Sequence, residues 1–104
     1  MISLEQQVQK IKSDNPYDPI YIYGAGNLGI HAAWFLEKLD IRVTAFLDHD
    51  SRKNAVAGIP VYLPDEILSD STDKVIFITA GAMRAREILR NIEIASRNPD
   101  RTLI

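Results

Sequence analysis

The stretch Ile20-Tyr-Ile-Tyr-Gly-Ala-Gly-Asn-Leu-Gly29 joins a short uncharged run of β-prone residues to three glycines spaced Gly-x-Gly-x-x-Gly. A β-prone run without charge is typical of a central strand that is covered on both faces. From about residue 27 to residue 39 the pattern becomes helical. The predicted inward face of this helix consists of Leu28, Ala32, Phe35, Leu36 and Leu39. The glycines therefore lie where a buried strand turns into a helix.

Strand and helix patterns alternate on both sides of this stretch. Residues 3–13 predict a helix that begins with a Ser3–Gln6 capping box, and residues 14–19 break it. Beyond the glycines, the predicted elements are a strand at 42–47, a loop through Gly58, a brief edge strand at 59–62, a short helix at 64–68, a strand at 74–79, a helix at about 83–96 and a further strand from 101. Such alternation predicts an α/β fold of three layers, in which a short parallel sheet of three to four strands carries helices on both faces. We expect one domain over residues 20–104, preceded by a helix and linker over residues 1–19.

The composition is that of an ordinary globular domain. The 104 residues include 12 basic and 14 acidic side chains, with neither sign massed in one block, whereas a nucleic-acid surface needs a basic face. Cysteine is absent, which excludes disulfides, a thiolate nucleophile and a Cys-based zinc site. No apolar run approaches the roughly 18 residues of a membrane span, and the polar N-terminus is unlike a signal peptide. We therefore expect a cytoplasmic protein with no nucleic-acid or membrane partner.

The three glycines suit a ligand that carries phosphates. Gly24 permits a tight turn out of the strand, Gly26 has no side chain to block a pyrophosphate, and Gly29 lets the helix pack close to the sheet. The backbone N–H groups near Asn27 and Leu28, together with the helix dipole, favour an anion. A glycine turn that only shapes the corner between strand and helix is the alternative interpretation.

An acid and a second strand end complete the predicted nucleotide site. Asp48 follows Gly29 by about 20 residues, at the end of the next predicted strand. A carboxylate there accepts hydrogen bonds from ribose hydroxyls and repels a 2′-phosphate, so NAD is favoured, while NADP and nucleotide-sugars stay open. Thr79 and Gly81 end the third predicted strand, on the edge where open α/β sheets bind ligands. S-adenosylmethionine is a rival ligand, disfavoured because Tyr23 stands where its sites usually have an acid.

Four segments together resemble the CoA-binding-like group of NAD(P)-binding Rossmann domains: Gly24-Ala-Gly-Asn-Leu-Gly29, Ala45-Phe-Leu-Asp48, Gly58-Ile-Pro-Val-Tyr62 and Pro64-Asp-Glu-Ile67. The resemblance covers about residues 20–90. It is closest to the NADH-sensing domain of Rex redox repressors and to Rossmann-like domains of sugar-modifying enzymes, including nucleotide-sugar dehydratases and sugar acyltransferases. The first likeness implies that the three glycines contact a pyrophosphate and that Asp48 contacts the adenosine ribose. The second implies NAD or a nucleotide-sugar in the same crevice, with the catalytic residues in another domain.

The chain departs from the Rex pattern because no winged helix precedes the domain and no swapped helix trails it, so DNA binding is not implied. Its length accommodates little more than one half of a dinucleotide fold, and we expect a further C-terminal domain or a homodimer. The predicted function is a nucleotide-binding domain, for NAD(H) first, of a larger sugar-modifying or redox-responsive protein. Whether the chain belongs to an enzyme is left open, and a domain of an enzyme is favoured over an enzyme by itself. The alternative is a non-catalytic module that binds a nucleotide-sugar or mediates assembly, with no dinucleotide bound.

No catalytic or metal-binding set is predicted. His31 and His49 are interpreted as surface residues, and Arg84 and Arg86 as solvated helix charges. The predicted cofactor-binding residues are Gly24, Gly26, Asn27, Leu28, Gly29, Asp48, Thr79 and Gly81.

Overall fold

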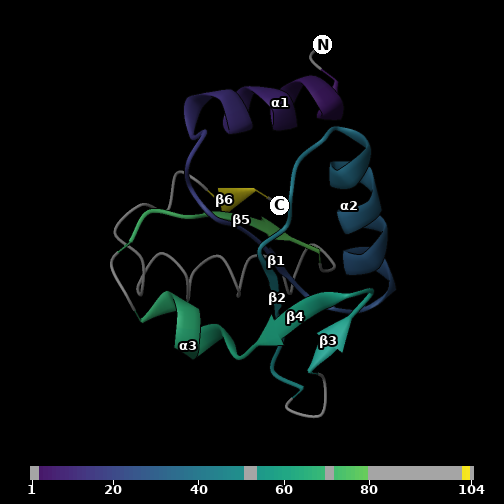
Figure 1. Ribbon diagram of the computed structural model, residues 1–104, viewed down its shortest axis with the longest axis vertical. Coiled ribbons are helices and arrows are strands. Elements are labelled where there is room, and N and C mark those ends of the chain that lie inside the picture. The colour runs from purple at the N-terminus through teal and green to yellow at the C-terminus, as the bar shows by residue number, and fades with distance from the viewer. Residues whose placement is uncertain (1–2, 51–53, 70–71, 80–101, 104) are drawn as a thin grey trace.

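A sheet of mostly parallel strands forms the centre of the molecule (Figure 1). This computed structural model describes residues 3–50, 54–69, 72–79 and 102–103. In these ranges the parallel strands are β1 (Ile20–Tyr23), β2 (Ala45–Leu47), β4 (Ile59–Tyr62), β5 (Val75–Ile78) and β6 (Thr102–Leu103). The two-residue β3 (Ala55–Val56) lies antiparallel to β4, and the strand order is β3-β4-β2-β1-β5-β6. The predicted α/β class is confirmed, but the described part of the chain contains five parallel strands where three to four were predicted.

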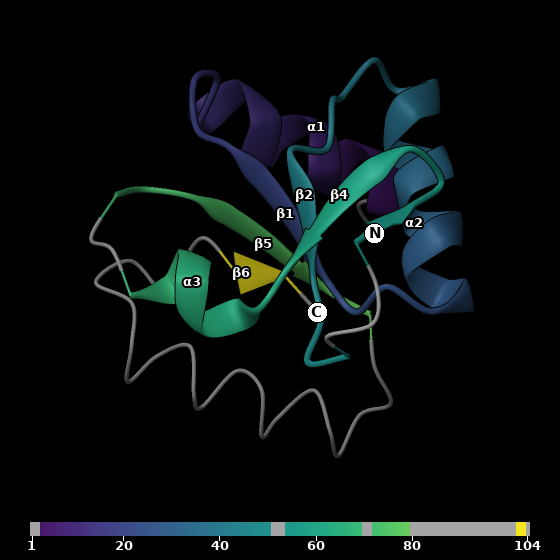
Figure 2. The same cartoon turned by 60° about the horizontal axis from the view of Figure 1, so that its bottom comes forward.

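Helices cover both faces of the sheet, as predicted. The helices α1 (Leu4–Asp14) and α2 (Asn27–Lys38) pack on one face, whereas α3 (Pro64–Leu68) packs on the other (Figure 2). This arrangement is consistent with a Rossmann-like domain. No helix in the described part of the chain is both long and apolar enough to cross a membrane.

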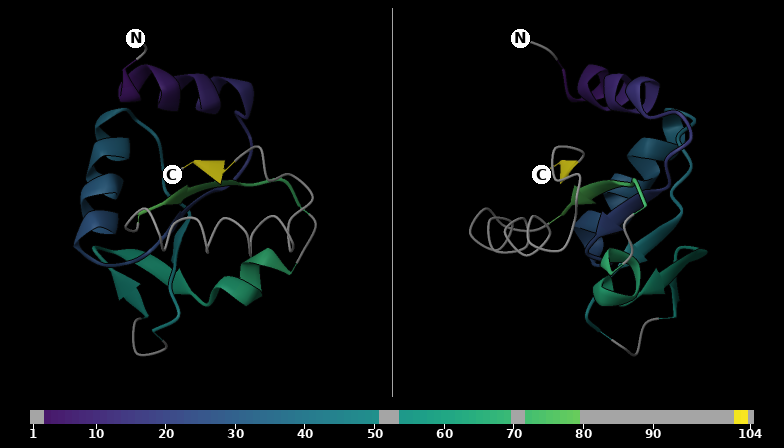
Figure 3. Two further views of the ribbon diagram at one scale, coloured as in Figure 1. Left: turned by 180° about the vertical axis from the view of Figure 1, so that it is seen from behind. Right: turned by 90° about the vertical axis from the view of Figure 1, so that its left-hand side faces the viewer.

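Each face of the sheet has its own apolar core, because successive side chains along a strand point to opposite faces. Ile22 and Phe46 are completely buried on the face that α1 and α2 cover, and Leu36 of α2 belongs to the same cluster. Figure 3 shows these helices and the sheet from two further sides. Leu47 and Ile76 are buried on the other face, in the cluster that α3 joins. The two cores hold the strand ends, and therefore the candidate site, in place from both sides.

The start of α1 is set by its capping box, which is confirmed. Ser3 Oγ accepts the Gln6 N–H at 3.1 Å, and Gln6 Oε1 accepts the Ser3 N–H at 3.1 Å. These bonds satisfy backbone donors that have no partner within the helix. The buried side chain of Val8 in this helix packs in the core on the sheet.

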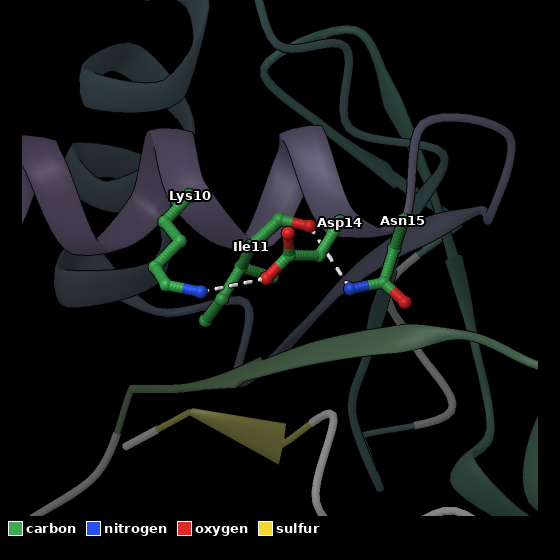
Figure 4. Close-up of polar contacts among 4 residues, drawn as sticks. All are labelled: Lys10, Ile11, Asp14 and Asn15. Atoms are coloured by element: carbon green, nitrogen blue, oxygen red, sulfur yellow. Dashed lines mark hydrogen bonds and ion pairs between the residues drawn. The ribbon is translucent and has the colours of Figure 1, made fainter.

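The end of α1 is closed by a side chain of the linker. Asn15 Nδ2 donates to the Ile11 carbonyl at 2.9 Å (Figure 4). Beside it, Lys10 and Asp14 form an ion pair at 3.0 Å, with both side chains largely in solvent. An exposed ion pair of this kind contributes little to stability. The hydrogen bond from Asn15 is therefore the more important contact at the end of α1.

The strand β2 is shorter than predicted, because it begins at Ala45 rather than at Arg42. Thr44 explains the difference. Its N–H donates to the Ile20 carbonyl at 2.7 Å, while its side-chain Oγ1 accepts the Ile20 N–H at 3.2 Å. The hydroxyl takes the place of a main-chain acceptor at Thr44, so the ladder with β1 starts at Ala45 and Arg42 lies before the strand.

Most of the predicted inward face of α2 is confirmed, and Leu28 is the exception. Its buried residues are Gly29, Ala33 and Leu36, whereas Leu28 is 66% exposed. Ala32, Phe35 and Leu39, which were predicted to face inward, are half-buried and pack against this core. The prediction followed the larger apolar residues, but a helix that packs closely on a sheet places its smallest side chains at the contact.

The segment before β4, predicted as a loop, contains β3 and a tight turn. Ala57 and Gly58 have positive φ angles of 52° and 77°. Two positive φ angles are typical of the two-residue turns that join antiparallel strands. The Val61 N–H donates to the Asn54 carbonyl at 3.0 Å, and Pro60, which has no N–H, is in register with Ala55. The hairpin was missed because alanine is an unusual residue at the first turn position.

Some predicted features lie outside the described residues. They include the helix at 83–96, with Arg84 and Arg86, and the candidate ligand-binding residue Gly81.

Candidate functional site

The glycine turn lies at the carboxyl end of β1, in the middle of the sheet (Figure 1). The chain builds β2 and β4 on one side of β1 and then crosses to the other side for β5 and β6. Open α/β sheets bind ligands at the carboxyl edge, in the crevice where the strand order reverses in this way. The glycines therefore occupy the position at which this fold class places a ligand.

Gly24 and Gly29 are required by the backbone of the turn itself. Gly24 has a φ of 114°, and a Cβ atom on it would lie 2.7 Å from Thr79 Oγ1. A Cβ atom on Gly29 would collide with the Gly24 carbonyl oxygen and lie 3.3 Å from the Phe46 ring. The first turn of α2 thus packs directly on the glycine turn and on β2, which is the packing role expected of Gly29.

Gly26 is different, because the space beside it is open. It is the exposed N-cap residue of α2, no side chain caps the helix there, and a Cβ atom on it would meet no atom within 4 Å. Asn27 and Leu28 follow as the first helical residues, and both are exposed. The N–H groups of a first helical turn have no acceptor within the helix and carry its positive dipole end. An anionic group can approach this end without displacing a side chain.

Asp48 holds the glycine turn from the β2 side. Its half-buried carboxylate accepts the Ala25 N–H at Oδ2, over 2.9 Å, and the Asp50 N–H at Oδ1, over 2.8 Å. The sequence spacing placed Asp48 at a strand end near the glycines, and the structure brings the two together. The bond to Ala25 was not predicted, because the sequence reasoning considered only a contact between Asp48 and ribose.

Thr79 holds the same turn from the β5 side. Its N–H donates to the Tyr23 carbonyl at 3.0 Å, and its hydroxyl lies 3.1 Å from that oxygen and 3.3 Å from the Gly24 carbonyl oxygen. The hydroxyl of Thr79 therefore donates to the backbone of the turn. In this structure Thr79 supports the turn, a role that the sequence reasoning did not consider.

Tyr23 and His49 form a further contact at this edge. Tyr23, a residue of β1, is only 8% exposed, and its hydroxyl lies 2.8 Å from His49 Nε2. His49 itself is exposed, as is His31, whose ring lies beside that of Trp34. Within the described ranges, no three His, Asp or Glu side chains are grouped so as to hold a metal ion.

Hollows border the sheet at both edges. One of about 490 Å³ lies at the amino edge, where Arg42 and Gly58 precede β2 and β4. Another, of about 180 Å³, lies at the carboxyl edge and is lined by Asp48, Tyr62 and Glu66 among others. The larger hollow is not lined by any residue of the glycine turn. We therefore locate the candidate site at the carboxyl edge, where the open end of α2 and the Asp48 carboxylate adjoin.

Comparisons with known proteins add no assignment, since the sequence matches no protein-family model and no curated protein. The site is therefore interpreted from its own geometry and chemistry.

Proposed function

We propose that this chain is a Rossmann-like domain that binds a nucleotide through its diphosphate and ribose, with NAD(H) as the first candidate. The observation that carries the proposal is the open N-terminus of α2 at Gly26 beside the carboxylate of Asp48, which lies 2.9 Å from the Ala25 nitrogen. A dinucleotide presents a diphosphate and a ribose next to each other. The resemblance of residues 20–90 to CoA-binding-like Rossmann domains supports the same class of ligand.

The two parts of such a ligand have opposite electrostatic requirements, and the site offers both. A diphosphate is stabilised by the free N–H groups and positive dipole of a helix N-terminus. Ribose hydroxyls donate to a carboxylate such as Asp48, whose negative charge disfavours a 2′-phosphate. The proposal therefore ranks NAD(H) above NADP(H).

The turn is also organised before a ligand arrives. Asp48 from β2 and Thr79 from β5 each bond to the backbone of the turn, and Gly29 packs α2 against it. A preorganised site loses less conformational entropy on binding than a mobile one. This supports a working site over a turn that only connects two elements.

We further propose that the domain serves a larger, cytoplasmic, sugar-modifying or redox-responsive protein, and that chemistry occurs in another domain or subunit. The groups proposed to contact the ligand, the N–H groups at the start of α2 and the Asp48 carboxylate, suit binding and orienting it. A non-catalytic module that binds a nucleotide-sugar is the alternative, and the same experiment separates the two.

The test is a calorimetric titration of the purified chain with NAD, NADH, NADP, CoA, S-adenosylmethionine and UDP- and GDP-sugars, paired with thermal melts. We expect NAD or NADH to bind, and NADP to bind more weakly. A ligand at about 100 times its Kd raises the free energy of unfolding by about 2.7 kcal/mol, which a melt detects readily. Binding of nucleotide-sugars alone supports the alternative module. If none of these ligands binds, the nucleotide-binding proposal and the nucleotide-sugar alternative are both contradicted. The glycine turn then serves only to connect β1 to α2.

A further inference from the structure

The hollow of about 490 Å³ at the amino edge of the sheet lies outside the proposed nucleotide site. It is bordered by the second half of α2, by the chain at 40–44 that leads into β2, and by the turn and the start of β4 at 57–60. These segments all belong to the described ranges 3–50 and 54–69. Pockets that hold a small organic ligand measure roughly 300 to 1,000 Å³, so the volume of this hollow suits a compact molecule.

Part of the lining of this hollow is the edge of an apolar core. Ala33 and Ile41 are buried and belong to the cluster that α1 and α2 cover. Val43 and Ile59 are half-buried and pack against the same cluster. Apolar surface that a ligand places against these residues is removed from water. The apolar lining therefore favours a ligand with an aliphatic part.

Charged side chains of both signs also line the hollow. They are those of Glu37, Asp40 and Arg42, and all three are exposed. In the described part of the chain none of the three takes part in an ion pair, although they share one hollow. The carboxylates accept hydrogen bonds, and the guanidinium group offers N–H donors in a planar fork that fits a carboxylate. The hollow can therefore hold a cationic and an anionic group of one ligand.

The end of α2 strengthens the negative side of the hollow. Asp40, with a φ of 59°, follows the last helical turn, and its N–H donates to the Glu37 carbonyl at 2.9 Å. Glycine or asparagine is the usual residue at such a position. The carbonyl end of a helix carries a partial negative charge, so a carboxylate beside it is disfavoured for the helix itself. An ammonium group bound there is attracted by the helix end and by both carboxylates.

We propose that this hollow binds a small aliphatic α-amino acid. Glu37, Asp40 and the carbonyl end of α2 hold its ammonium group, Arg42 holds its carboxylate, and the apolar lining contacts its side chain. A ligand with a single charge fits less well, because Arg42 repels an amine and the two acids repel a carboxylate. The hollow shares no lining residue with the glycine turn or with Asp48, so the inference goes beyond the proposed function and does not depend on it.

The test is a calorimetric titration of the purified chain with L-leucine and three compounds that each lack one part of it. Glycine lacks the aliphatic side chain, 3-methylbutylamine lacks the carboxylate, and 4-methylpentanoate lacks the ammonium group. We expect L-leucine to bind. Each of the other compounds should bind about fivefold more weakly or worse, the factor that corresponds to one net hydrogen bond.

Two variants assign the contacts to side chains. Arg42→Gln should weaken L-leucine about fivefold or more and should not weaken 3-methylbutylamine, which has no carboxylate. Glu37→Gln should weaken both compounds, because both carry the ammonium group. Lys38→Gln and Glu5→Gln are the matched controls, since both side chains are exposed and neither lines the hollow. The controls should bind L-leucine as the wild type does.

Three results would overturn the inference. They are no binding of L-leucine at millimolar concentration, equal affinity for L-leucine and either singly charged compound, and unchanged L-leucine affinity in folded Arg42→Gln and Glu37→Gln variants. Urea denaturation of each variant shows whether a lost affinity reflects a lost fold. The comparison of compounds uses the wild-type chain alone, so it decides the inference even where a variant does not fold.

Discussion

Gly26 and Gly29 belong to the same turn, yet a methyl group should lower mainly the stability at Gly29 and mainly the ligand affinity at Gly26. Gly29→Ala drives a Cβ atom into the Gly24 carbonyl oxygen, a backbone atom that cannot rotate away. We expect the free energy of unfolding to fall by about 2 kcal/mol or more, as in other overpacked sites. Urea denaturation measures this loss. A variant as stable as the wild type would contradict the close packing of α2 on the turn.

Gly26→Ala tests the ligand site without disturbing the fold. Its Cβ atom meets no other atom, so the expected loss of stability is about 1 kcal/mol or less, the difference between glycine and alanine at an N-cap. The methyl group does occupy the approach to the N-terminus of α2, and we expect NADH affinity to fall about tenfold or more. Calorimetry and urea denaturation on the same preparation give both numbers. Wild-type affinity in this variant would show that phosphates do not approach here.

Asp48→Asn separates the charge of this side chain from its shape. The amide retains one acceptor oxygen, so either the Ala25 or the Asp50 N–H loses its partner, at a cost of about 1 to 3 kcal/mol. Loss of the negative charge should also raise the affinity for NADP relative to NAD. The control is Asp40→Asn, at an exposed position whose φ of 59° asparagine readily adopts. Urea denaturation should show no loss in the control, and an unchanged NADP-to-NAD ratio in Asp48→Asn would contradict the ribose contact.

Thr79→Val and Thr44→Val form a matched pair. Each removes one side-chain hydrogen bond to the backbone of the β1 segment, Thr79 at the glycine turn and Thr44 at the amino end of the strand. We expect Thr79→Val, which removes a donor, to lower the free energy of unfolding by about 1 kcal/mol, and Thr44→Val, which leaves the Ile20 N–H without its acceptor, by about 1 to 3 kcal/mol. Only Thr79→Val should weaken NADH in calorimetry, because only Thr79 supports the turn. Equal weakening by both would mean that affinity follows global stability instead.

At the scale of the element, the capping box of α1 allows a direct measurement. Ser3→Ala removes the acceptor for the Gln6 N–H and should lower the free energy of unfolding by about 1 kcal/mol. The weakened helix should lower the stability of the whole domain, because the buried Val8 of α1 is part of the core on the sheet. Ser13→Ala, at an exposed position inside the same helix, is the control and should be neutral or slightly stabilising. Urea midpoints that move equally in the two variants would contradict the capping role.

The elements that could be predicted from the sequence are those with strong local signals. The capping box at Ser3, the proline at the start of α3 and the uncharged run of β1 each determine structure within a few residues. The misplaced boundaries depend on a partner distant in the sequence. The start of β2 is decided by Thr44 bonding to Ile20, and the burial of Gly29 in the first turn of α2, where Leu28 was predicted to face inward, by how closely Gly29 packs. Apolar periodicity contains neither piece of information.

At the scale of the whole molecule, the parallel sheet explains how much of the candidate site could be predicted. Parallel strands end at one edge, so Gly24, Asp48 and Thr79 were expected near one another from their places after three strands, and the structure brings them together. The directions of their bonds depend on which strands are neighbours. For that reason the bond from Ala25 to Asp48 was not predicted, and neither was the exposed ring of Tyr62 beside it.

Phe46 links this site to the core of the molecule. It is completely buried in the cluster that joins α1, α2 and the sheet, and its ring lies beneath Gly29. Phe46→Ala should cost about 3 to 5 kcal/mol, a large part of the roughly 5 to 15 kcal/mol that stabilises a domain. Phe46→Leu fills most of the cavity and should cost under about 1.5 kcal/mol.

The two Phe46 variants also test whether the glycine turn and the core act as one unit. Urea denaturation with and without NADH gives the stability that the ligand adds, expected at about 2.7 kcal/mol for the wild type at 100 times its Kd. Removing the ring that supports the first turn of α2 should weaken NADH, so Phe46→Ala should gain less from the same ligand concentration, whereas Phe46→Leu should gain nearly the full amount. An equal gain in both variants would show that the turn keeps its geometry without support from the core, and that the bonds from Asp48 and Thr79 are sufficient to hold it.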